Sequence, residues 1–435
     1  MKVSVIGTGY VGLTTGVCLA DLGHTVLCVD NNAEKIAGLK KGISPIFEPG
    51  MEELLEKGMK SGRLGFVDDI AGAVKQGEII FICVNTPSRE DGKAELKYVE
   101  KVAKEVAANL DGNYRVIVDK STVPVKTAEK VRETIERYGT EGIKFDVVSN
   151  PEFLREGTAI KDTMEPDRIV IGSDSEKATK KMLELYKPLI DRTGAPVRLV
   201  SVRSAELIKH GANTFLAMKI SFANLIAQVC EEAGADALEV LDAIGLDERI
   251  GSRFLTPGIG FGGSCFPKDI AAFNRTLGIL GVDSSLVRAV EQINKSAWQR
   301  FIHKVEKELW VLDGKVIGVL GLAFKPDTDD IRNAPAFKII EELREKGSVI
   351  RVYDPKAMDR ARVEYPDLEF CGDPYAVVKG AEALLVCTEW EEFKTLDLGR
   401  VKELMQVPII FDGRNIFDKN AAEKAGFRYF GIGRA

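Results

Sequence analysis

Three glycines near the start of the chain, Gly7, Gly9 and Gly12, constrain the fold more than any other feature. They follow an apolar run, Lys2–Ile6, and precede a segment with a helical pattern. Glycines at this spacing let the chain turn sharply from a strand into a helix, and they let its backbone approach a pyrophosphate at the helix N-terminus. The sequence therefore predicts a βαβ unit with a dinucleotide site, which includes Tyr10 and Val11 between the glycines.

An acidic residue, Asp30, ends the next predicted strand. A carboxylate at this position accepts hydrogen bonds from ribose hydroxyls and would repel a 2′-phosphate, so the site favours NAD over NADP. Lys35 is close enough in sequence to assist at the ribose or the phosphates. Thr86 and Thr122 follow later strands and could line the cofactor, or they could simply serve the turns in which they lie.

Strand-like and helical stretches alternate in residues 1–200 and again from Lys315 onward, which is typical of parallel α/β sheets. Between them, Arg203–Ala233 reads as one long helix. We predict an α/β fold with two doubly wound Rossmann-like domains, residues 1–200 and 301–435, joined by a central helical domain, residues 201–300. The predicted strands are Lys2–Ile6, Thr25–Val29, Ile79–Val84, Val116–Asp119, Asp146–Ser149 and Arg168–Ile171 in the first part and Lys315–Leu320, Val349–Tyr353, Ala383–Cys387 and Ile409–Phe411 in the last.

The composition is that of an ordinary globular protein. The net charge of −6 gives no reason to expect a nucleic acid or an anionic membrane as partner. No apolar run reaches the roughly 18 residues of a membrane helix, and the chain begins as a core strand, so we expect a cytoplasmic protein. Most of the seven cysteines lie in apolar stretches, as reduced buried thiols do, and three histidines argue against a histidine-rich metal site.

The most informative loop runs from Gly258 to Asp269 and contains Cys265. Its four glycines permit close approach of backbone to a ligand. Pro267 suits the start of a helix, which places Cys265 at or just before the helix N-terminus and beside Lys268. The helix N-terminus and the Lys268 ammonium both stabilise a thiolate, so Cys265 is a candidate nucleophile. Without such context, a cysteine is more often inert than catalytic.

Polar residues of two further segments are candidates for the same chemistry. Lys209 and Asn213 share a face of the long helix with Glu206, and an ammonium with an amide could stabilise an oxyanion. The simpler reading is a solvated helix face. Glu152 and Glu156 would be neighbours if a helix starts there, and they could then merely favour its N-terminus.

The chain resembles the UDP-glucose/GDP-mannose dehydrogenases over nearly its whole length. The markers are Gly7–Gly12, Asn150–Gly157, Ala205–Asn213, Gly260–Asp269, Phe324–Arg332 and Phe411–Asn415. The form of the cysteine loop is more similar to the UDP-glucose branch than to the GDP-mannose or UDP-N-acetylmannosamine branches. Two departures are Leu225, where glutamate is common in the family, and Asn333, where an acidic residue is common.

The resemblance implies oxidation of the 6-hydroxymethyl group of UDP-glucose to a carboxylate, which gives UDP-glucuronate, with two NAD and through a thioester on Cys265. It implies that Lys209, Asn213, Asp269, Thr122 and Glu156 assist Cys265. It further implies cofactor contacts by Thr86, Thr122, Glu156, Lys268 and Arg332. The implied substrate contacts are Glu152, Phe153, Leu154, Arg155, Glu156, Lys209, Asn213, Phe254, Leu255, Thr256, Pro257, Gly258, Gly262, Phe324 and Lys325, with Arg249 and Arg414 reaching across a homodimer interface.

Two alternatives remain open at this point. The substrate could be another UDP-sugar, such as UDP-N-acetylglucosamine or UDP-galactose. From a different class, the chain could be a non-catalytic nucleotide-binding sensor. A two-electron hydroxyacid dehydrogenase is disfavoured, because it would not need Cys265. The hydride count separates the classes, because a four-electron enzyme acting on any UDP-sugar forms about two NADH per sugar, a two-electron enzyme about one, and a sensor none.

Overall fold

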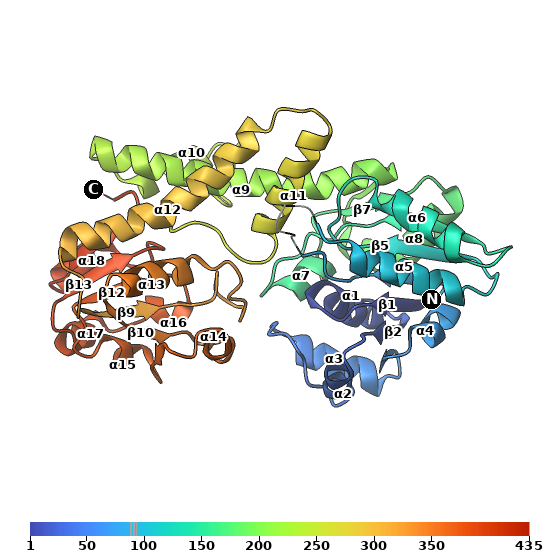
Figure 1. The fold of residues 1–435 in the computed structure, drawn as a ribbon, viewed down its shortest axis with the longest axis horizontal. Coiled ribbons are helices and arrows are strands. Elements are labelled where there is room, and N and C mark those ends of the chain that lie inside the picture. The colour runs from blue at the N-terminus through green and yellow to red at the C-terminus, as the bar shows by residue number, and fades with distance from the viewer. Residues whose placement is uncertain (88, 90–91, 93, 435) are drawn as a thin grey trace. The chain divides into compact units, whose positions relative to one another are not determined.

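The computed structural model describes residues 1–87, 89, 92 and 94–434, and its contacts divide the chain into two compact units. Unit 1 comprises Met1–Ala212 and Ala271–Leu280, and unit 2 comprises Asn213–Ile270 and Gly281–Ala435. Each unit contains a doubly wound sheet with Rossmann-like topology (Figure 1), which confirms the predicted α/β fold class.

Within the described residues, the sheet of unit 1 has eight strands in the order β3-β2-β1-β4-β5-β6-β7-β8. Neighbouring strands are parallel, apart from β6 and β7. The strand order reverses between β1 and β4, and a ligand site is expected at the carboxyl ends there. The bounds are β1 (Lys2–Ile6), β2 (Thr25–Val29), β3 (Leu64–Val67), β4 (Ile79–Ile82), β5 (Arg115–Asp119), β6 (Phe145–Ser149), β7 (Ile169–Gly172) and β8 (Val197–Val200).

Helices cover both faces of this sheet, which is why its central strands are apolar without interruption. In β4, Phe81 points into one core and Ile82 into the other. The first core packs on α1, α3 and α8, and the second on α4, α5 and α6. The helices are α1 (Tyr10–Asp21), α2 (Ala33–Leu39), α3 (Met51–Lys60), α4 (Ile70–Gln76), α5 (Lys97–Asn109), α6 (Thr127–Tyr138), α7 (Ala159–Met164), α8 (Glu176–Thr193), and α11 (Phe266–Ile279), most of which belongs to unit 1.

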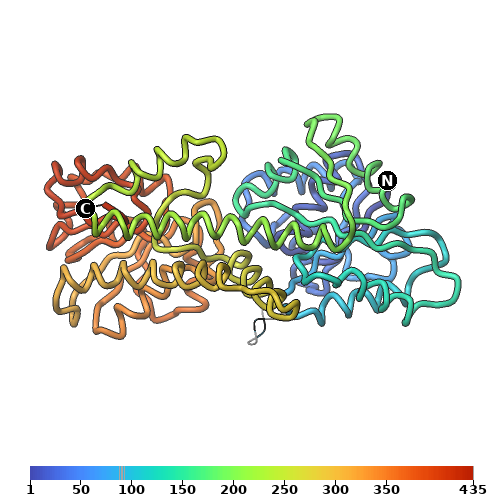
Figure 2. The backbone as a smooth tube through the Cα atoms, turned by 90° about the horizontal axis from the view of Figure 1, so that it is seen from above, coloured from blue at the N-terminus to red at the C-terminus, as the bar shows by residue number. Residues whose placement is uncertain are grey.

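The long helix of the central segment is α9 (Val202–Ala233), which begins one residue before the predicted start. Its first residues belong to unit 1 and the residues from Asn213 onward to unit 2. In unit 2 the end of α9 lies beside the C-terminal segment (Figure 2), where the amide of Gly433 donates to the Glu231 carboxylate. In the part of the chain that the structure describes, no helix combines the length and the apolar character needed to cross a membrane.

In unit 2 the described strands form a parallel sheet in the order β11-β10-β9-β12-β13-β14. The strands are β9 (Val316–Leu320), β10 (Val349–Tyr353), β11 (Glu369–Phe370), β12 (Ala383–Val386), β13 (Ile409–Asp412) and β14 (Arg428–Gly431). The helices are α10 (Ala237–Gly245), α12 (Ser285–Leu309), α13 (Pro335–Glu345), α14 (Met358–Glu364), α15 (Pro374–Val378), α16 (Glu391–Lys394), α17 (Leu398–Leu404) and α18 (Lys419–Lys424).

Every predicted strand is present, with each end within two residues of its predicted position. Four short strands, β3, β8, β11 and β14, were not predicted. Two of them, β3 and β8, contain a glycine or exposed polar residues, so their apolar pattern is weak.

Candidate active site

The glycine turn after β1 has the close backbone contacts that its sequence predicts. Gly7 has φ +99°, and a Cβ there would lie 2.5 Å from the Cys83 carbonyl oxygen. A Cβ on Gly12 would lie 1.9 Å from the Gly7 carbonyl oxygen. Helix α1 starts at Tyr10, directly after Gly9, and no acidic side chain lies in its first turn. The helix N-terminus is therefore suited to an anionic pyrophosphate.

Asp30 lies directly after β2 and reaches back to the glycine turn. Its carboxylate accepts from the backbone amide of Thr8 at 3.0 Å, from the Thr8 hydroxyl at 2.7 Å and from Lys35 Nζ at 2.8 Å. Burial alone would raise the pKa of Asp30, but the hydrogen bonds from Lys35 and Thr8 outweigh it and leave the pKa below its usual value. The residue is thus a charged acceptor beside the turn, as a ribose ligand requires.

The loops after β4 and β5 are joined by two hydrogen bonds. The Thr86 hydroxyl donates to the Thr122 carbonyl oxygen at 2.9 Å, and the Ser121 hydroxyl donates to the Val84 carbonyl oxygen at 2.9 Å. Thr86 is buried. Both predicted threonines therefore lie at the carboxyl edge of the sheet, next to the loop that follows β1.

Glu152 and Lys209 form a buried ion pair in unit 1. Lys209 Nζ lies 2.8 Å from Glu152 Oε1, and each side chain is only 6% exposed. The second carboxylate oxygen of Glu152 accepts from the Leu154 amide, and Lys209 Nζ lies 5.5 Å from the centre of the Phe153 ring. The structure thus rejects the solvated-face interpretation of Lys209.

No helix begins at Glu152, because the segment that follows Asn150 is a loop and α7 starts only at Ala159. The interpretation of Glu152 and Glu156 as a helix N-terminus was therefore wrong. Glu156 is buried, whereas Arg155 is exposed, and its guanidinium donates two hydrogen bonds to Asp162, at 2.9 and 2.6 Å. Arg155 therefore helps to hold the loop in place.

Glu48 was not singled out from the sequence, although its side chain fixes the end of the loop that follows Asn150. Its buried carboxylate accepts from the Gly157 amide at 2.7 Å and lies 3.4 Å from the Ile160 amide. In the sequence, Glu48 lies within the run Pro45–Gly50, after an apolar residue and before a proline. A run with two prolines and a glycine is equally typical of a simple turn, so it did not point to a buried glutamate.

The other polar residues of the α9 face are also buried. Glu206 accepts from the backbone amides of Lys126 and Ala128 at 2.7 and 2.9 Å, and so caps α6. In unit 2, Asn213 Nδ2 donates to Asp269 at 2.6 Å, and Lys268 Nζ donates to the other Asp269 oxygen at 2.7 Å. Asp269 is therefore an ionic acceptor that orients the Asn213 amide.

Cys265 lies immediately before α11, as predicted, and its side chain is exposed, whereas the other six cysteines are buried. Burial raises the pKa of Cys18 to about 12, and the pKa of Cys83 and Cys387 likewise to about 12, which makes these thiols inert. The structure thus singles out Cys265 as the accessible thiol of the described chain.

The glycines before Cys265 allow close packing in unit 2. A Cβ on Gly262 would lie 2.3 Å from the Asn333 carbonyl oxygen, and a Cβ on Gly263 would lie 2.8 Å from the Phe324 ring. Phe254 adopts φ +66°, and the run Leu255–Gly258 is largely buried. The predicted contacts Phe254–Gly258, Gly262 and Phe324 thus lie together around one loop of unit 2.

Four further predicted basic contacts of unit 2 also have partners within the chain: Arg249, Arg332, Arg414 and Lys325. The Arg249 side chain is 89% exposed and bonds Asp247, and the Arg332 guanidinium donates two hydrogen bonds to Asp330. Arg414 donates to the carbonyl oxygens of residues 260, 324 and 387. Lys325 Nζ lies 5.9 Å from the centre of the Phe324 ring. Arg414 is thus committed to holding backbone, whereas Arg249 is presented to solvent.

Asp354 is the counterpart of Asp30 in unit 2, since it follows β10 as Asp30 follows β2. It is 1% exposed, and its carboxylate accepts from the amides of Leu322, Ala323, Lys356 and Ala357 and from the Trp390 indole. A ribose has no room at such a carboxylate, and the turn after β9, Gly321–Phe324, lacks the glycine spacing of Gly7–Gly12. Both features favour a different ligand in unit 2.

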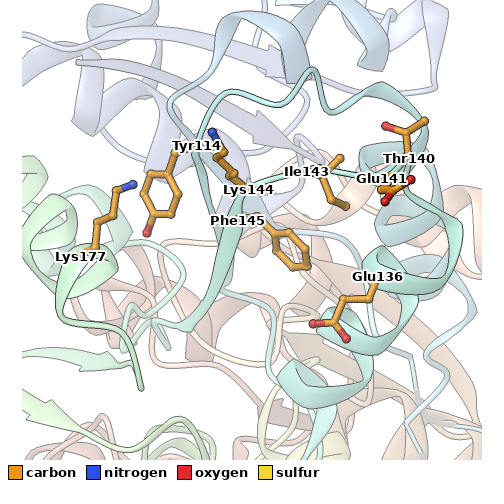
Figure 3. A pocket seen from close by; sticks show the side chains of 9 residues that line it. Tyr114, Glu136, Thr140, Glu141, Ile143, Lys144, Phe145 and Lys177 are labelled. Carbon is orange, nitrogen blue, oxygen red and sulfur yellow. The ribbon is translucent and has the colours of Figure 1, made fainter.

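A pocket also lies at the amino ends of β5 and β6 (Figure 3). It is lined by Tyr114, Glu136, Thr140, Glu141, Gly142, Ile143, Lys144, Phe145 and Lys177. Lys177 Nζ lies 3.6 Å from the centre of the Tyr114 ring. Doubly wound sheets bind their ligands at the carboxyl ends of strands, so this pocket is at the wrong edge for the cofactor.

Comparisons with known proteins agree with this geometry. The chain matches three models of the UDP-glucose/GDP-mannose dehydrogenase family: the NAD binding domain over residues 1–190, the central domain over 203–296 and the UDP binding domain over 318–419. It is 47% identical to UDP-glucose 6-dehydrogenase TuaD of Bacillus subtilis (strain 168), covering 100% of this chain and 93% of that protein. It is also 47% identical to UDP-glucose 6-dehydrogenase of Rhizobium meliloti (strain 1021), covering 100% of each. A solved UDP-glucose dehydrogenase from Pyrobaculum islandicum superposes with a TM-score of 0.93 at 39% identity, covering 100% of this chain and 98% of that one.

Proposed function

This chain belongs to the UDP-glucose/GDP-mannose dehydrogenase family, and we propose that it oxidises UDP-glucose to UDP-glucuronate with Cys265 as a covalent nucleophile. It is an NAD-dependent dehydrogenase. The observation that carries the choice of mechanism is the exposed Cys265 at the start of α11, preceded by a tightly packed glycine loop. The relatives named UDP-glucose 6-dehydrogenase support the choice of sugar.

Residues of unit 1 fit the cofactor. The close backbone contacts at Gly7 and Gly12 leave the N-terminus of α1 open to a pyrophosphate, and Asp30 supplies the ribose acceptor. We assign Tyr10, Val11, Lys35, Thr86 and Thr122 to the same site, with Glu156, Lys268 and Arg332 as further contacts. When bound, NAD accepts a hydride in each of the two oxidations.

The first oxidation converts the 6-hydroxymethyl group to an aldehyde and releases the hydroxyl proton. The ion pair with Glu152 favours the charged ammonium of Lys209, which suits stabilisation of an alkoxide more than proton abstraction by a neutral amine. We therefore assign the proton to water rather than to Lys209, and we propose Thr122 and Asp269 as the residues that assist this step.

In the proposed mechanism the second oxidation uses Cys265, since a free aldehyde has no hydroxyl whose oxygen could drive off a hydride. Attack by the thiolate on the aldehyde carbon forms a thiohemiacetal with an oxyanion. Lys209 and Asn213, one turn apart on α9, supply an ammonium and an amide for that charge. Loss of the remaining hydrogen as hydride leaves a thioester, which water hydrolyses to the carboxylate, with Asp269 or Glu156 as base.

We further propose that α9 forms a homodimer interface. Five apolar side chains on α9, which are 41 to 58% exposed, recur at helical spacing and form a stripe along it: Leu207, Phe215, Phe222, Leu225 and Val229. Packing the same stripe of a second copy against it would bury both. The exposed Arg249 would then be available to a partner's substrate. Light scattering that shows a monomer at micromolar concentration would refute the interface.

The three segments matched by the family models support the proposed division at residues 200 and 300. We also propose a cytoplasmic location, which the six buried, reduced cysteines favour.

One experiment tests the proposed reaction. Purified protein is incubated with NAD and, separately, with UDP-glucose, UDP-N-acetylglucosamine, UDP-galactose and GDP-mannose, and both NADH and the acid product are measured. We expect about two NADH per UDP-glucose, with UDP-glucuronate as product. A higher kcat/KM for another sugar nucleotide would identify that compound as the substrate instead. One NADH per sugar would contradict the covalent mechanism.

A further inference from the structure

The loop Gly258–Phe261 is held by side chains from separate elements of unit 2. From α9, Asn224 Oδ1 accepts from the Gly258 amide at 2.8 Å. From α12, Asn294 Oδ1 accepts from the Phe261 amide at 2.7 Å, while Nδ2 donates to the Phe261 carbonyl oxygen at 3.1 Å. Both polar groups of one backbone residue are thus satisfied by a single side chain, which a carboxamide can do because it carries a donor and an acceptor in one plane.

The contact between Asn294 and Phe261 depends on Gly260, the residue that precedes Phe261. Gly260 adopts φ +100°, and a Cβ there would lie 2.8 Å from Asn294 Oδ1. Arg414 Nη1 donates to the Gly260 carbonyl oxygen at 3.2 Å from the other side. The backbone at residues 260 and 261 is therefore fixed between α12 and the segment after β13.

An aromatic contact links the fixed backbone of Phe261 to the residue that follows Cys265. The Phe261 ring meets the Phe266 ring edge-on, with 5.7 Å between centroids and an interplanar angle of 87°. Phe254 packs on Phe266 from another direction, at 6.3 Å. Phe266 is the first residue of α11 and directly follows Cys265. A shift of Phe261 would therefore displace the start of α11 and the thiol with it.

We propose that Asn294 is a positioning residue, which fixes the substrate loop and, through Phe261 and Phe266, the place of the Cys265 thiol. The proposal rests on the proposed function, since it takes Cys265 as the nucleophile and the loop as a sugar-nucleotide contact. Asn294 contacts the loop backbone, so its proposed effect on the thiol and on the sugar is indirect. It acts on both through the backbone of one residue.

The test uses the full-length variants Asn294→Ala and Asn294→Asp, with Ser296→Ala as the matched control. Ser296 lies on the same helix, and its hydroxyl bonds only locally, to the Ile293 carbonyl oxygen at 2.9 Å. Three quantities are measured: steady-state constants for UDP-glucose and NAD, the rate at which iodoacetamide alkylates Cys265, and hydrogen exchange of peptides covering residues 255–266.

For Asn294→Ala we expect the KM for UDP-glucose to rise about tenfold, as loss of two hydrogen bonds implies, with the KM for NAD within about twofold. Hydrogen exchange should rise in the loop peptides and not elsewhere in unit 2. The rate at which iodoacetamide alkylates Cys265 should change by at least about threefold. Asn294→Asp keeps the shape and the acceptor for the Phe261 amide, so its effects should be intermediate. Ser296→Ala should behave as wild type.

Unchanged loop exchange and alkylation in Asn294→Ala would overturn the proposal. So would raised exchange throughout unit 2, because it would show a general loss of stability. If Asn294→Ala does not fold, the same readouts in Asn294→Asp decide the question. A wild-type protein that fails to oxidise UDP-glucose would refute the proposed substrate instead, and exchange and alkylation would still test the role of Asn294.

Discussion

Lys209 on α9 and Glu152 in the loop after β6 form a buried ion pair, with 2.8 Å between Nζ and Oε1. Removing one partner leaves a buried charge without compensation, which typically costs about 3 to 5 kcal/mol. Each single variant, Glu152→Gln and Lys209→Met, should therefore lose about 3 kcal/mol of unfolding free energy in urea. The double variant should regain most of that stability, whereas its turnover should stay at the level of Lys209→Met, because the ammonium is gone.

Lys187→Met is the control for this pair. Lys187 bonds Asp191 at 2.9 Å on the surface of α8, with both side chains more than half exposed. Its loss should change the unfolding free energy by less than about 0.5 kcal/mol. A double variant as unstable as the sum of its singles would show that the buried pair is not coupled.

Replacing Asp30 should weaken NAD binding. The Asp30→Ala variant loses the charged acceptor beside the glycine turn and the bonds that orient Thr8 and Lys35. Loss of one charge-assisted hydrogen bond to a ribose predicts a rise of at least about tenfold in the dissociation constant for NAD, measured by fluorescence titration. Asp21→Ala, which removes only a surface bond to Lys57, is the control. Full activity of the unaltered protein with NADP would contradict this role of Asp30.

Asp119 should make stability depend on pH. The side chain is 1% exposed, so its carboxylate is shielded from water. Burial, and then the charge of Glu206, raises the pKa of Asp119 well above its usual value of 3.8. At pH values between 3.8 and the raised pKa, the folded state holds a proton that the unfolded state has lost. The free energy of unfolding therefore falls as pH rises through this window.

The Asp119→Asn variant removes that proton and its pH dependence. Its slope of unfolding free energy against pH should be less negative by up to about 1.4 kcal/mol per pH unit within the window. The variant should therefore gain stability over wild type as pH increases above about 4, measured by urea unfolding at each pH. Parallel profiles for the two proteins would show that Asp119 is ionised in the folded state.

The sequence predicted the elements whose cause is local. The strands before Gly7 and Asp30 and the uninterrupted pattern of α9 depend on residues close together in the chain, and each was found in place. Cys265 was also placed correctly, because Pro267 marks a helix start without help from the rest of the fold.

Contacts between distant segments could not be predicted in the same way. The pair Lys209–Glu152 depends on how α9 passes the loop after β6, and the bonds of Glu48 to Gly157 join segments that no periodic pattern relates. The same holds for Arg414, whose three bonds to carbonyl oxygens require the loop that contains Gly260 to be folded beside it. The sequence indicated candidate residues for the chemistry, but not which partners hold them.

The most direct test of the mechanism is the Cys265→Ser variant. Alcohol oxidation to the aldehyde needs no thiol, whereas the second oxidation needs a nucleophile, and a serine hydroxyl without an activating base is a far poorer one. Any ester that does form should hydrolyse more slowly than a thioester. Steady-state turnover should therefore fall by at least about a thousandfold, while binding of UDP-glucose and NAD changes little, because serine nearly conserves the size of the side chain.

The stalled species identifies the step. Stopped-flow absorbance should show a burst of NADH in Cys265→Ser, and intact-protein mass spectrometry should show either bound aldehyde or an adduct heavier by one UDP-glucuronyl group. Cys371→Ser, a substitution of a buried cysteine in unit 2, should retain turnover. Near-native turnover of Cys265→Ser would eliminate the covalent route, and the second oxidation would then have to proceed through the hydrated aldehyde, whose gem-diol supplies the hydroxyl that the free aldehyde lacks.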